Sequence, residues 1–253
     1  MNETLTIVIP AFNESKRILK TLNEIDEYIF KKSLKNFLRV IVVNDGSLDD
    51  TELTVKNWIQ LKGKNKELFQ VLGYTPNYGK GYAVREGFLR ASTDLVLYTD
   101  ADGAAPIIEA EKLLAAIKDG YDVAIGSRVI KTSNSEVTMS VFRRFIGRIF
   151  HMILSILGLA EFKDTQCGFK LFRSAIAKEL VQNQKCFGFS FDIEYLFLLK
   201  RMGYKIKEVP ISWYHVGGSK VNIFKDSIRM LLEVLKIRFV YKYNVTDLKT
   251  RGQ

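Results

Sequence analysis

Two carboxylates stand one residue apart where an apolar run ends. Leu95–Tyr98 are apolar, and Asp100, Asp102 and Gly103 come next after one threonine. Alternate residues of a strand point to opposite faces, but a glycine permits a sharp turn through which both acids can approach one cation. Oxygen ligands without imidazole suit Mg²⁺ or Mn²⁺, which is commonly shared with a diphosphate. The pair therefore predicts a metal site that neutralises charge on a diphosphate leaving group.

Two other polar stretches could also bind parts of a nucleotide. Asp45 ends the run "VIVVND", where its carboxylate could accept from a base N–H or a ribose hydroxyl; the alternative is an N-cap of the next helix, which Ser47 or Asp49 could equally supply. The stretch "NYGKGYAVREG" resembles a phosphate-cradling loop that opens a helix, but it matches neither common glycine-rich phosphate pattern. Its glycines could be turn residues, and Lys80 could be solvated.

The elements that must position these residues alternate along the first half of the chain. Short β-branched runs predict strands, and apolar residues at helical spacing predict the helices between them. This order favours an α/β fold with parallel βαβ units, in which ligands bind at the carboxyl ends of the strands. The stretches "IPAFNE", "VNDGS", "YTDADG" and "IGSR" should therefore line one crevice. We predict strands at 5–12, 37–45, 68–74, 95–100 and 121–127, and helices at 14–32, 50–63, 81–92 and 107–118.

The pattern changes after Ser127. A Ser/Thr-rich stretch, 131–140, is a candidate lid, and a basic, apolar helix is expected at about 141–160. A strand at 205–215 and a helix at 227–243 follow. One predicted stripe of that last helix is apolar, and the basic residues lie largely outside the stripe. The helix could therefore lie on an anionic membrane or pack on the protein's own core. The stripe consists of Ile228, Leu231, Leu232, Leu235 and Phe239.

Composition narrows the class of protein. The 253 residues are 47% hydrophobic, which suits one or two domains. No window approaches the ~18 apolar residues of a membrane span, and the start does not resemble a secretory signal. Two cysteines, Cys167 and Cys186, make no disulfide framework, so a reducing compartment is expected. We expect a soluble or peripheral cytosolic protein.

The positive charge is clustered. The formal net charge is +10, and residues 127–163 hold six Lys or Arg against two acids, while residues 216–253 hold eight against three. Such segments favour an anionic partner: a phospholipid surface, a phosphorylated substrate or nucleic acid. A solubilising surface is the alternative. Since no stacking module or helix-turn-helix accompanies them, nucleic acid is not an expected partner.

The motifs together carry a resemblance to a known family. The series "TIVIPAFNE", "VVNDGS", "NYGKGYAVREG", "TDADGA" and "GSR" resembles the family-2 inverting glycosyltransferases. The downstream "DTQCGFKLF", "FSFDIEYL", "EVPISW" and "GGSK" are similar to the dolichyl-phosphate glucosyltransferase branch, related to the mannosyltransferases. The resemblance runs from about Thr6 to Lys236. It implies a GT-A (Rossmann-like) domain over 1–215, a mostly parallel sheet flanked by helices, and a basic amphipathic segment over 216–253, in the same domain or facing a membrane.

The resemblance also implies roles for particular residues. Asp100 and Asp102 would hold Mg²⁺ or Mn²⁺ and the donor diphosphate, and Asp192 would orient an arginine or the sugar, unless it only starts a helix capped by Ser190. His215 could be a late metal ligand, whereas His151 should be packed. The nucleotide would contact Pro10, Ala11, Phe12, Glu14, Asp45, Lys80 and Ala101. The acceptor phosphate would face Arg128, Arg143 and Arg144. The transferred sugar would lie near Asp164 and Gln166.

The expected reaction moves glucose from UDP-glucose to a polyprenyl (dolichyl) phosphate with inversion. A phosphate acceptor needs no strong general base, since its second pKa is about 6. The site must instead hold two anions, which a metal and arginines can do. The mannosyltransferase pattern tends to have Gln where this chain has Ala104, which favours the glucosyl reaction. The sequence does not show the hydrophobic N-terminal anchor that is common in this branch. Residues 142–159 and the C-terminal helix would then contact the cytosolic face of the endoplasmic reticulum. The alternative is a cytoplasmic protein.

Three other functions stay open from the sequence. One is a GDP-mannose-dependent mannosyltransferase, or transfer to another polyprenyl phosphate. Another is a catalytically silent protein that binds nucleotide sugars, although the intact acidic pair and Arg128 argue against loss of activity. The third is a nucleic-acid-binding protein that uses the two basic segments, although no stacking-aromatic module or helix-turn-helix accompanies them. A nucleotidyltransferase is disfavoured because its usual glycine-rich N-terminal loop is missing.

Overall fold

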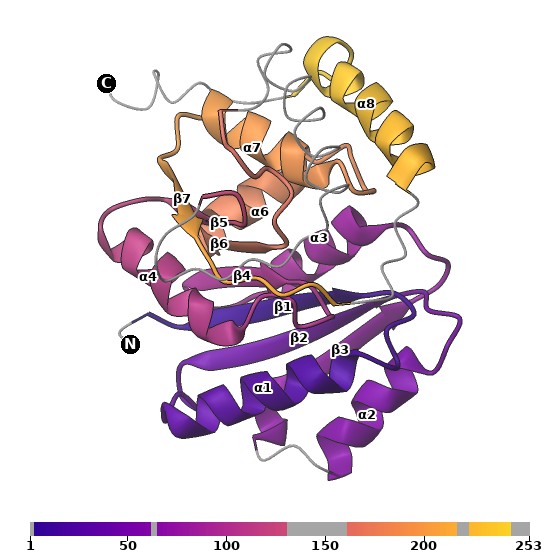
Figure 1. Cartoon of the computed structure of the whole chain (residues 1–253), viewed down its shortest axis with the longest axis vertical. Helices are drawn as coiled ribbons and strands as arrows, with labels where there is room; N and C mark the ends of the chain where they lie inside the picture. The colour runs from indigo at the N-terminus through magenta and orange to yellow at the C-terminus, as the bar shows by residue number, and fades with distance from the viewer. Residues whose placement is uncertain (1–2, 62–64, 131–160, 217–222, 244–253) are drawn as a thin grey trace.

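A computed structural model describes residues 3–61, 65–130, 161–216 and 223–243 (Figure 1). The predicted lid at 131–140 and the basic helix at 141–160 lie outside these residues, and so does the "GGSK" motif. Arg143, Arg144 and His151 therefore stay predictions.

A seven-stranded sheet forms the centre of the described structure. Its order is β3-β2-β1-β4-β6-β5-β7, and β6 runs antiparallel to both neighbours while the other paired strands are parallel. The strands are β1 (Leu5–Ala11), β2 (Leu38–Asp45), β3 (Phe69–Tyr74), β4 (Leu95–Thr99), β5 (Val123–Ser127), β6 (Phe169–Arg173) and β7 (Ile206–Pro210).

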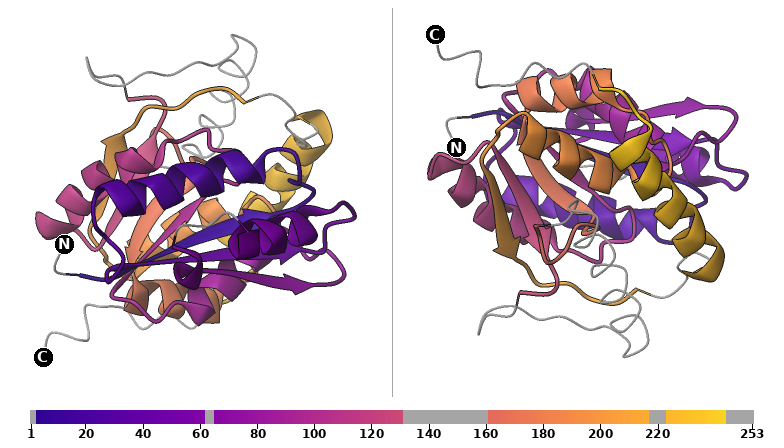
Figure 2. Two further views of the ribbon diagram at one scale, coloured as in Figure 1. Left: turned by 90° about the horizontal axis from the view of Figure 1, so that it is seen from below. Right: turned by 90° about the horizontal axis from the view of Figure 1, so that it is seen from above.

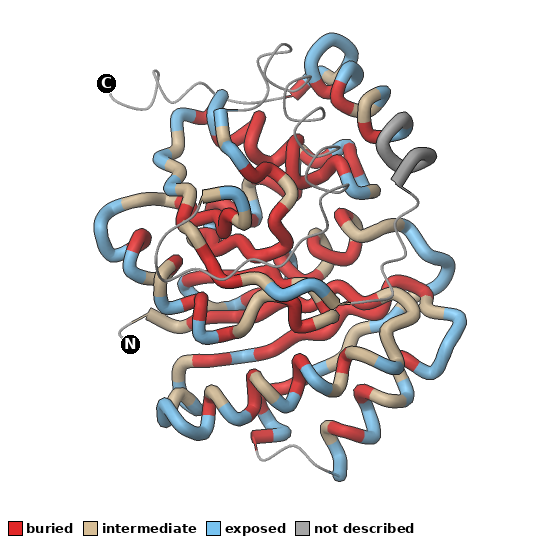
Figure 3. Tube along the Cα trace, viewed as in Figure 1, coloured by how far each residue is buried: buried red, intermediate tan, exposed pale blue. Residues whose placement is uncertain are grey.

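Helices cover both faces of this sheet because its central strands are apolar on both sides (Figure 2). β1 and β4 are buried along their whole length (Figure 3). One core lies under α1 (Ile18–Lys31), α2 (Thr51–Leu61) and α4 (Ala110–Lys118). The other lies under α3 (Lys80–Arg90), α6 (Ser174–Asn183), α7 (Phe191–Arg201) and α8 (Ile223–Phe239). Short 3-10 turns occur at η1 (Lys66–Leu68) and η2 (Ile107–Glu109).

The α/β prediction is confirmed, but several predicted elements differ from the observed ones: α1 begins at Ile18 where a helix from 14 was predicted, and α8 spans Ile223–Phe239 where 227–243 was predicted. The sequence pattern did not separate β6 from the helix that follows it, yet β6 is inserted between β4 and β5. The observed strand β7 is shorter than the predicted strand at 205–215, since it ends at Pro210. The element order and the alternation of strands and helices from β1 to β5 are as predicted.

Helix α8 packs on the core through a different stripe from the predicted one. Met230, Val234 and Ile237 are buried, whereas Leu232 and Phe239 are 55% and 71% exposed. At 100° per residue these two groups lie on opposite sides of the helix. The helix therefore has two apolar sides, one buried and one facing outward. None of the helices in the described ranges is long and apolar enough to cross a membrane.

Candidate active site

The ends of the strands are tied together where the predicted motifs lie. After β1, the backbone N–H of Asn13 donates to Ser47 Oγ, 2.8 Å away, in the turn after β2. The Thr21 hydroxyl of α1 donates to the Ala101 carbonyl oxygen at 2.7 Å. The backbone N–H of Tyr214 donates to the Ala104 carbonyl at 2.8 Å. The first bond joins the ends of β1 and β2, and the other two bring α1 and the segment after β7 to the turn that carries Asp100 and Asp102.

The turn at residues 100–104 is built around glycines. Gly103 has a φ of 67°, a left-handed conformation that glycine adopts without strain. Gly168 faces the Asp100 carboxylate so closely that a Cβ there would lie 2.2 Å from Oδ2. The Ala104 N–H donates to Asp102 Oδ1 at 3.0 Å, while burial and the nearby charge of Asp100 raise the pKa of Asp102. A cation would relieve this repulsion.

Two basic side chains flank the acidic pair. Lys80 Nζ lies 2.6 Å from Asp100 Oδ1. Burial, the largest single effect, would lower the pKa of Lys80, but the charges of Asp100, Asp192 and Asp102 and the hydrogen bond to Asp100 together raise it. Lys80 is therefore paired, which overturns the solvated alternative. Arg17 is paired with Glu14 and also interacts electrostatically with Asp102 and Asp100. Sequence reasoning missed Arg17, whose position three residues after Glu14 was the available signal.

Asp45 ties the end of β2 to the glycine-containing loop before α3. Its carboxylate accepts from Asn77 Nδ2 at 2.7 Å and from the N–H groups of Tyr78 and Gly79, both at 2.9 Å. Burial raises the pKa of Asp45 despite these bonds. Asp49, not Asp45, accepts the Thr51 N–H at the start of α2. The N-cap alternative for Asp45 is therefore wrong.

The other predicted nucleotide contacts lie at the end of β1. Pro10 and Ala11 pair with Val43 and Asn44 of β2. Phe12 follows them and is partly exposed. The Glu14 side chain is engaged with Arg17, and the Glu14 backbone N–H donates to Thr51 Oγ1 at 2.7 Å. This segment thus borders the turn after β2 on the side of Asp45.

A second charged centre forms where β5 ends. Arg128 binds the Asp164 carboxylate through Nε and Nη2, both at 2.8 Å, and through its backbone N–H at 2.9 Å. The Asp164 side chain is 4% exposed and that of Arg128 23%. Burial alone would raise the pKa of Asp164, but the guanidinium holds it below its usual value. The Arg128 guanidinium also lies 5.6 Å from the Trp213 ring centre. Asp164 thus fixes the guanidinium of Arg128, whose side chain stays partly exposed.

Two more predicted residues lie near this centre. The Asp192 side chain is 4% exposed and accepts from Lys170 Nζ at 2.6 Å. It therefore orients a lysine, where an arginine or the sugar was expected, and the Ser190 side chain makes no capping bond. Gln166 Nε2 lies 3.7 Å from Met230 Sδ of α8. Lys170 was missed, although a lysine within the apolar run "GFKLF" was a signal.

The acidic pair fits a divalent cation that a substrate helps to bind. Across the described ranges, no cluster of three or more His, Cys, Asp or Glu side chains forms an all-protein metal site. Mg²⁺ is usually held by one or two carboxylates together with substrate phosphates, and that is the set Asp100 and Asp102 provide. His215 follows Tyr214, whose backbone is bonded to Ala104. Its role as a late ligand stays a prediction.

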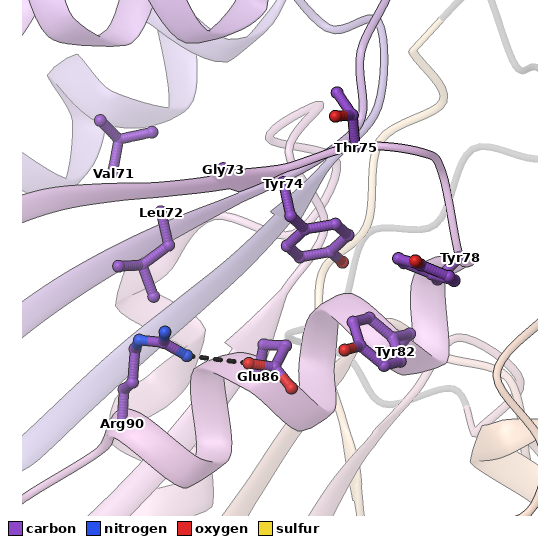
Figure 4. Close-up of a pocket in the computed structure, with 9 residues that line it drawn as sticks. All are labelled: Val71, Leu72, Gly73, Tyr74, Thr75, Tyr78, Tyr82, Glu86 and Arg90. Carbon is purple, nitrogen blue, oxygen red and sulfur yellow. Dashed lines mark hydrogen bonds and ion pairs between the residues drawn. The ribbon is translucent and has the colours of Figure 1, made fainter.

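A separate groove lies between β3 and α3 (Figure 4). Three aromatic rings line it, with Glu86 and Arg90 at one end joined by an ion pair. Of the predicted site residues that the structure describes, none lines this groove. Its residues are Val71, Leu72, Gly73, Tyr74, Thr75, Tyr78, Tyr82, Glu86 and Arg90.

Comparison with known proteins identifies relatives over most of the chain. The sequence model of a family described as "Glycosyl transferase family 2" matches residues 6–181. A dolichyl-phosphate beta-glucosyltransferase of Saccharomyces cerevisiae is 36% identical over 250 residues, covering 94% of this chain and 75% of the relative. The human protein of the same name is 31% identical over 246 residues, with the same two coverages.

Among solved structures, the fold is similar to a glucosyl-3-phosphoglycerate synthase of Mycobacterium tuberculosis in complex with Mn²⁺ and UDP-glucose. The TM-score is 0.68 at 18% identity, covering 97% of this chain and 81% of that one. At this identity the likeness concerns the fold alone, and it agrees with the GT-A architecture.

Proposed function

Because this chain belongs to glycosyl transferase family 2 and is a glycosyltransferase, we propose that it moves glucose from UDP-glucose to a dolichyl or other polyprenyl phosphate with inversion. The acceptor and the sugar are those in the names of the relatives from yeast and human. The UDP donor rests on the motif pattern, including Ala104, and is the choice over GDP-mannose. Mg²⁺ or Mn²⁺ is the proposed cofactor.

The observation that carries the proposal is a pair of separate charged centres joined by one loop, which we take to be two anion-binding centres. The first consists of Asp100 and Asp102 with Lys80 beside them. The second is Arg128, fixed by Asp164. Residues 164–168 join the two, since Asp164 holds Arg128 and Gly168 contacts Asp100. A site that must bring two phosphorylated substrates together needs two such centres, because each anion must be held and its charge offset.

Each of these residues has a separate role in the proposed reaction. Asp45 and the end of β1 would bind the nucleoside, and Lys80 would donate to the diphosphate. The acceptor phosphate would be held by the partly exposed side chain of Arg128, with an oxygen directed at the anomeric carbon from the side opposite the departing UDP. A cation bound by Asp100 and Asp102 would offset the charge on that leaving group. Since the acceptor is already ionised near pH 7, no general base is required.

We also propose that α8 rests on a membrane. Leu232, Leu235 and Phe239 form its outward apolar side, and Arg229, Lys236 and Arg238 lie on either flank. An apolar stripe between basic residues is typical of a helix that lies in an anionic lipid surface. On the buried side of the same helix, Met230 Sδ lies 3.7 Å from Gln166 Nε2, so the helix itself lies beside the site. A peripheral position on the cytosolic face of the endoplasmic reticulum would present the lipid acceptor there.

Vesicle flotation tests the membrane contact. Leu232→Ser/Phe239→Ser should bind phosphatidylserine-containing vesicles at least about 100-fold more weakly, because each of the two side chains contributes about 1.5–3 kcal/mol when fully buried and each 1.4 kcal/mol is about a factor of ten. Leu53→Ser is the matched control, since Leu53 is an equally exposed leucine on α2. Equal flotation of the double variant and the control would refute the assignment of α8.

A transfer assay tests the reaction. Radiolabelled UDP-glucose and GDP-mannose are compared as donors to a short polyprenyl phosphate, with Mg²⁺ or Mn²⁺. Product from UDP-glucose alone is expected, and Asp102→Ala should abolish it together with metal-dependent UDP binding. Product from GDP-mannose alone would keep the mechanism and replace the donor. Binding of UDP and metal without product from either donor would refute the acceptor and favour a silent nucleotide-sugar-binding protein.

A further inference from the structure

Lys170 is a charged residue in the middle of the sheet. It lies on β6, between β4 and β5, and its side chain is 1% exposed. A buried ammonium is strongly unfavourable unless it is paired and its N–H groups find acceptors. The contacts of Lys170 should therefore show why a lysine occupies this position in an apolar strand.

Its ammonium group has four oxygen partners. Besides Asp192 Oδ1 at 2.6 Å and the Tyr98 hydroxyl at 3.1 Å, it lies 3.0 Å from the carbonyl oxygen of Thr165 and 2.8 Å from that of Cys167. Asp192 and Tyr98 come from α7 and β4. The two carbonyls belong to the loop that joins the two anion-binding centres. Lys170 thus fastens that loop to the sheet and to α7.

The same loop is fixed at its other positions by side chains or backbone. The N–H groups of Lys163 and Asp164 donate to the Glu208 carboxylate at 3.0 and 2.8 Å. The Asp100 N–H donates to the Gly168 carbonyl at 3.2 Å. Lys170 holds the stretch between these two ends. Because Asp164 orients Arg128 and Gly168 contacts Asp100, a shift of the loop would displace both centres.

We propose that Lys170 is a positioning residue for both substrates, acting through the carbonyl groups of Thr165 and Cys167. It touches neither the donor nor the acceptor. Its ammonium keeps the loop at 164–168 in the one conformation in which the guanidinium of Arg128 and the carboxylate of Asp100 are both in place. This inference rests on the proposed function for the identity of the substrates, but the fixed loop itself does not.

The test separates this role from that of a buried ion pair. In Asp192→Asn the buried ammonium loses its charged partner, so the protein should be less stable than wild type, but the lysine keeps both carbonyl partners and the kcat of this variant serves as the reference for the next one. In Lys170→Met/Asp192→Asn both buried charges are removed, which commonly preserves folding. The carbonyls then lose their donor, and kcat and the affinity for Mn²⁺ with UDP should each fall roughly 10- to 100-fold, as when other groups that orient metal ligands are lost.

Hydrogen exchange of the loop gives a readout that needs no activity. Amides 163–168 should exchange faster in the double variant than in Asp192→Asn, while those of β1 stay protected. A folded double variant with the kcat, metal affinity and loop exchange of Asp192→Asn would overturn the proposal. If it does not fold, Lys170→Gln/Asp192→Asn replaces it. The glutamine side chain is one bond shorter than lysine, so it should hold the two carbonyls less well and lower kcat, and a kcat equal to that of Asp192→Asn would again overturn the proposal. A wild-type protein that gives no product refutes the proposed reaction, whereas the exchange experiment still tests Lys170.

Discussion

A single methyl group at residue 168 should disable the donor centre without unfolding the protein. In Gly168→Ala the new carbon would lie 2.2 Å from Asp100 Oδ2, 2.4 Å from Cγ and 2.5 Å from Oδ1, whereas ordinary contacts begin at 3.4 Å. The backbone of Gly168 is not in the left-handed region, so alanine adds no strain to the main chain there. The clash falls on one side chain, and Asp100 is the group that must move.

The size of that movement sets the expected loss. The carboxylate has to shift by roughly 1 Å, about five times the ~0.2 Å tolerance of a metal–oxygen distance. An off-rotamer side chain costs about 0.5–1.5 kcal/mol, which a folded domain can accommodate. We therefore expect thermal unfolding close to that of wild type. Misplaced orienting groups lower metal affinity about 10- to 100-fold, so binding of Mn²⁺ in the presence of UDP should weaken by that factor.

Titration of Mn²⁺ against protein and UDP, followed by electron paramagnetic resonance, measures this directly. Gly188→Ala is a matched control, because the nearest atoms to its added carbon are the Glu233 carboxylate oxygens at 3.9 Å. That variant should bind like wild type. Gly168→Ala with unchanged affinity and an intact fold would show that the position of Asp100 does not set metal binding, and the acidic pair would lose its proposed role.

Two further changes test the paired charges. Lys80→Met removes the ammonium that neutralises Asp100, so Mn²⁺ alone should bind more tightly. The KM for UDP-glucose should rise roughly tenfold, because a charge-assisted hydrogen bond to the donor is lost. Mn²⁺ titration and steady-state kinetics measure these two values, and unchanged values would remove Lys80 from the donor site. Asp164→Asn should cost about 3–5 kcal/mol near pH 7, because Arg128 loses its buried partner. Since the folded-state pKa of Asp164 is depressed, its contribution is present above the ordinary value of 3.8 and is lost as the pH falls below it. The urea midpoints of wild type and variant should therefore converge in acid, and a constant difference would contradict the pairing.

The sequence predicted the parts of the fold that local patterns determine. Apolar runs of β-branched residues such as Leu38–Asp45 gave the strands, and polar residues after them gave the edge where the site lies. The turn through Gly103 follows from the need for a left-handed residue between the acidic pair and the next turn. Each of these inferences uses residues that are close in the chain.

The structure added what depends on distant partners. Arg128 and Asp164 are 36 residues apart, and Lys170 and Asp192 are 22 apart, so no spacing rule links them. β6 is five residues long and is inserted between strands from earlier in the chain, which periodicity does not reveal. Helix α8 has apolar residues on two sides, and its pattern alone does not tell which side meets the core.

The exposure of the three ion pairs indicates which one substrate binding can open. The side chains of Lys170 and Asp192 are 1% and 4% exposed, so that pair is part of the interior. Asp164 is as buried as Asp192, but its partner Arg128 is 23% exposed and can donate outward while the pair stays intact. Lys80 and Asp100 are 22% and 37% exposed, and both partners are accessible. Only in this last pair can an incoming diphosphate take the ammonium while a cation takes the carboxylate. On the proposed function, the donor centre would therefore be the end of this charge network that can exchange partners, and the Lys170–Asp192 pair would be its buried end.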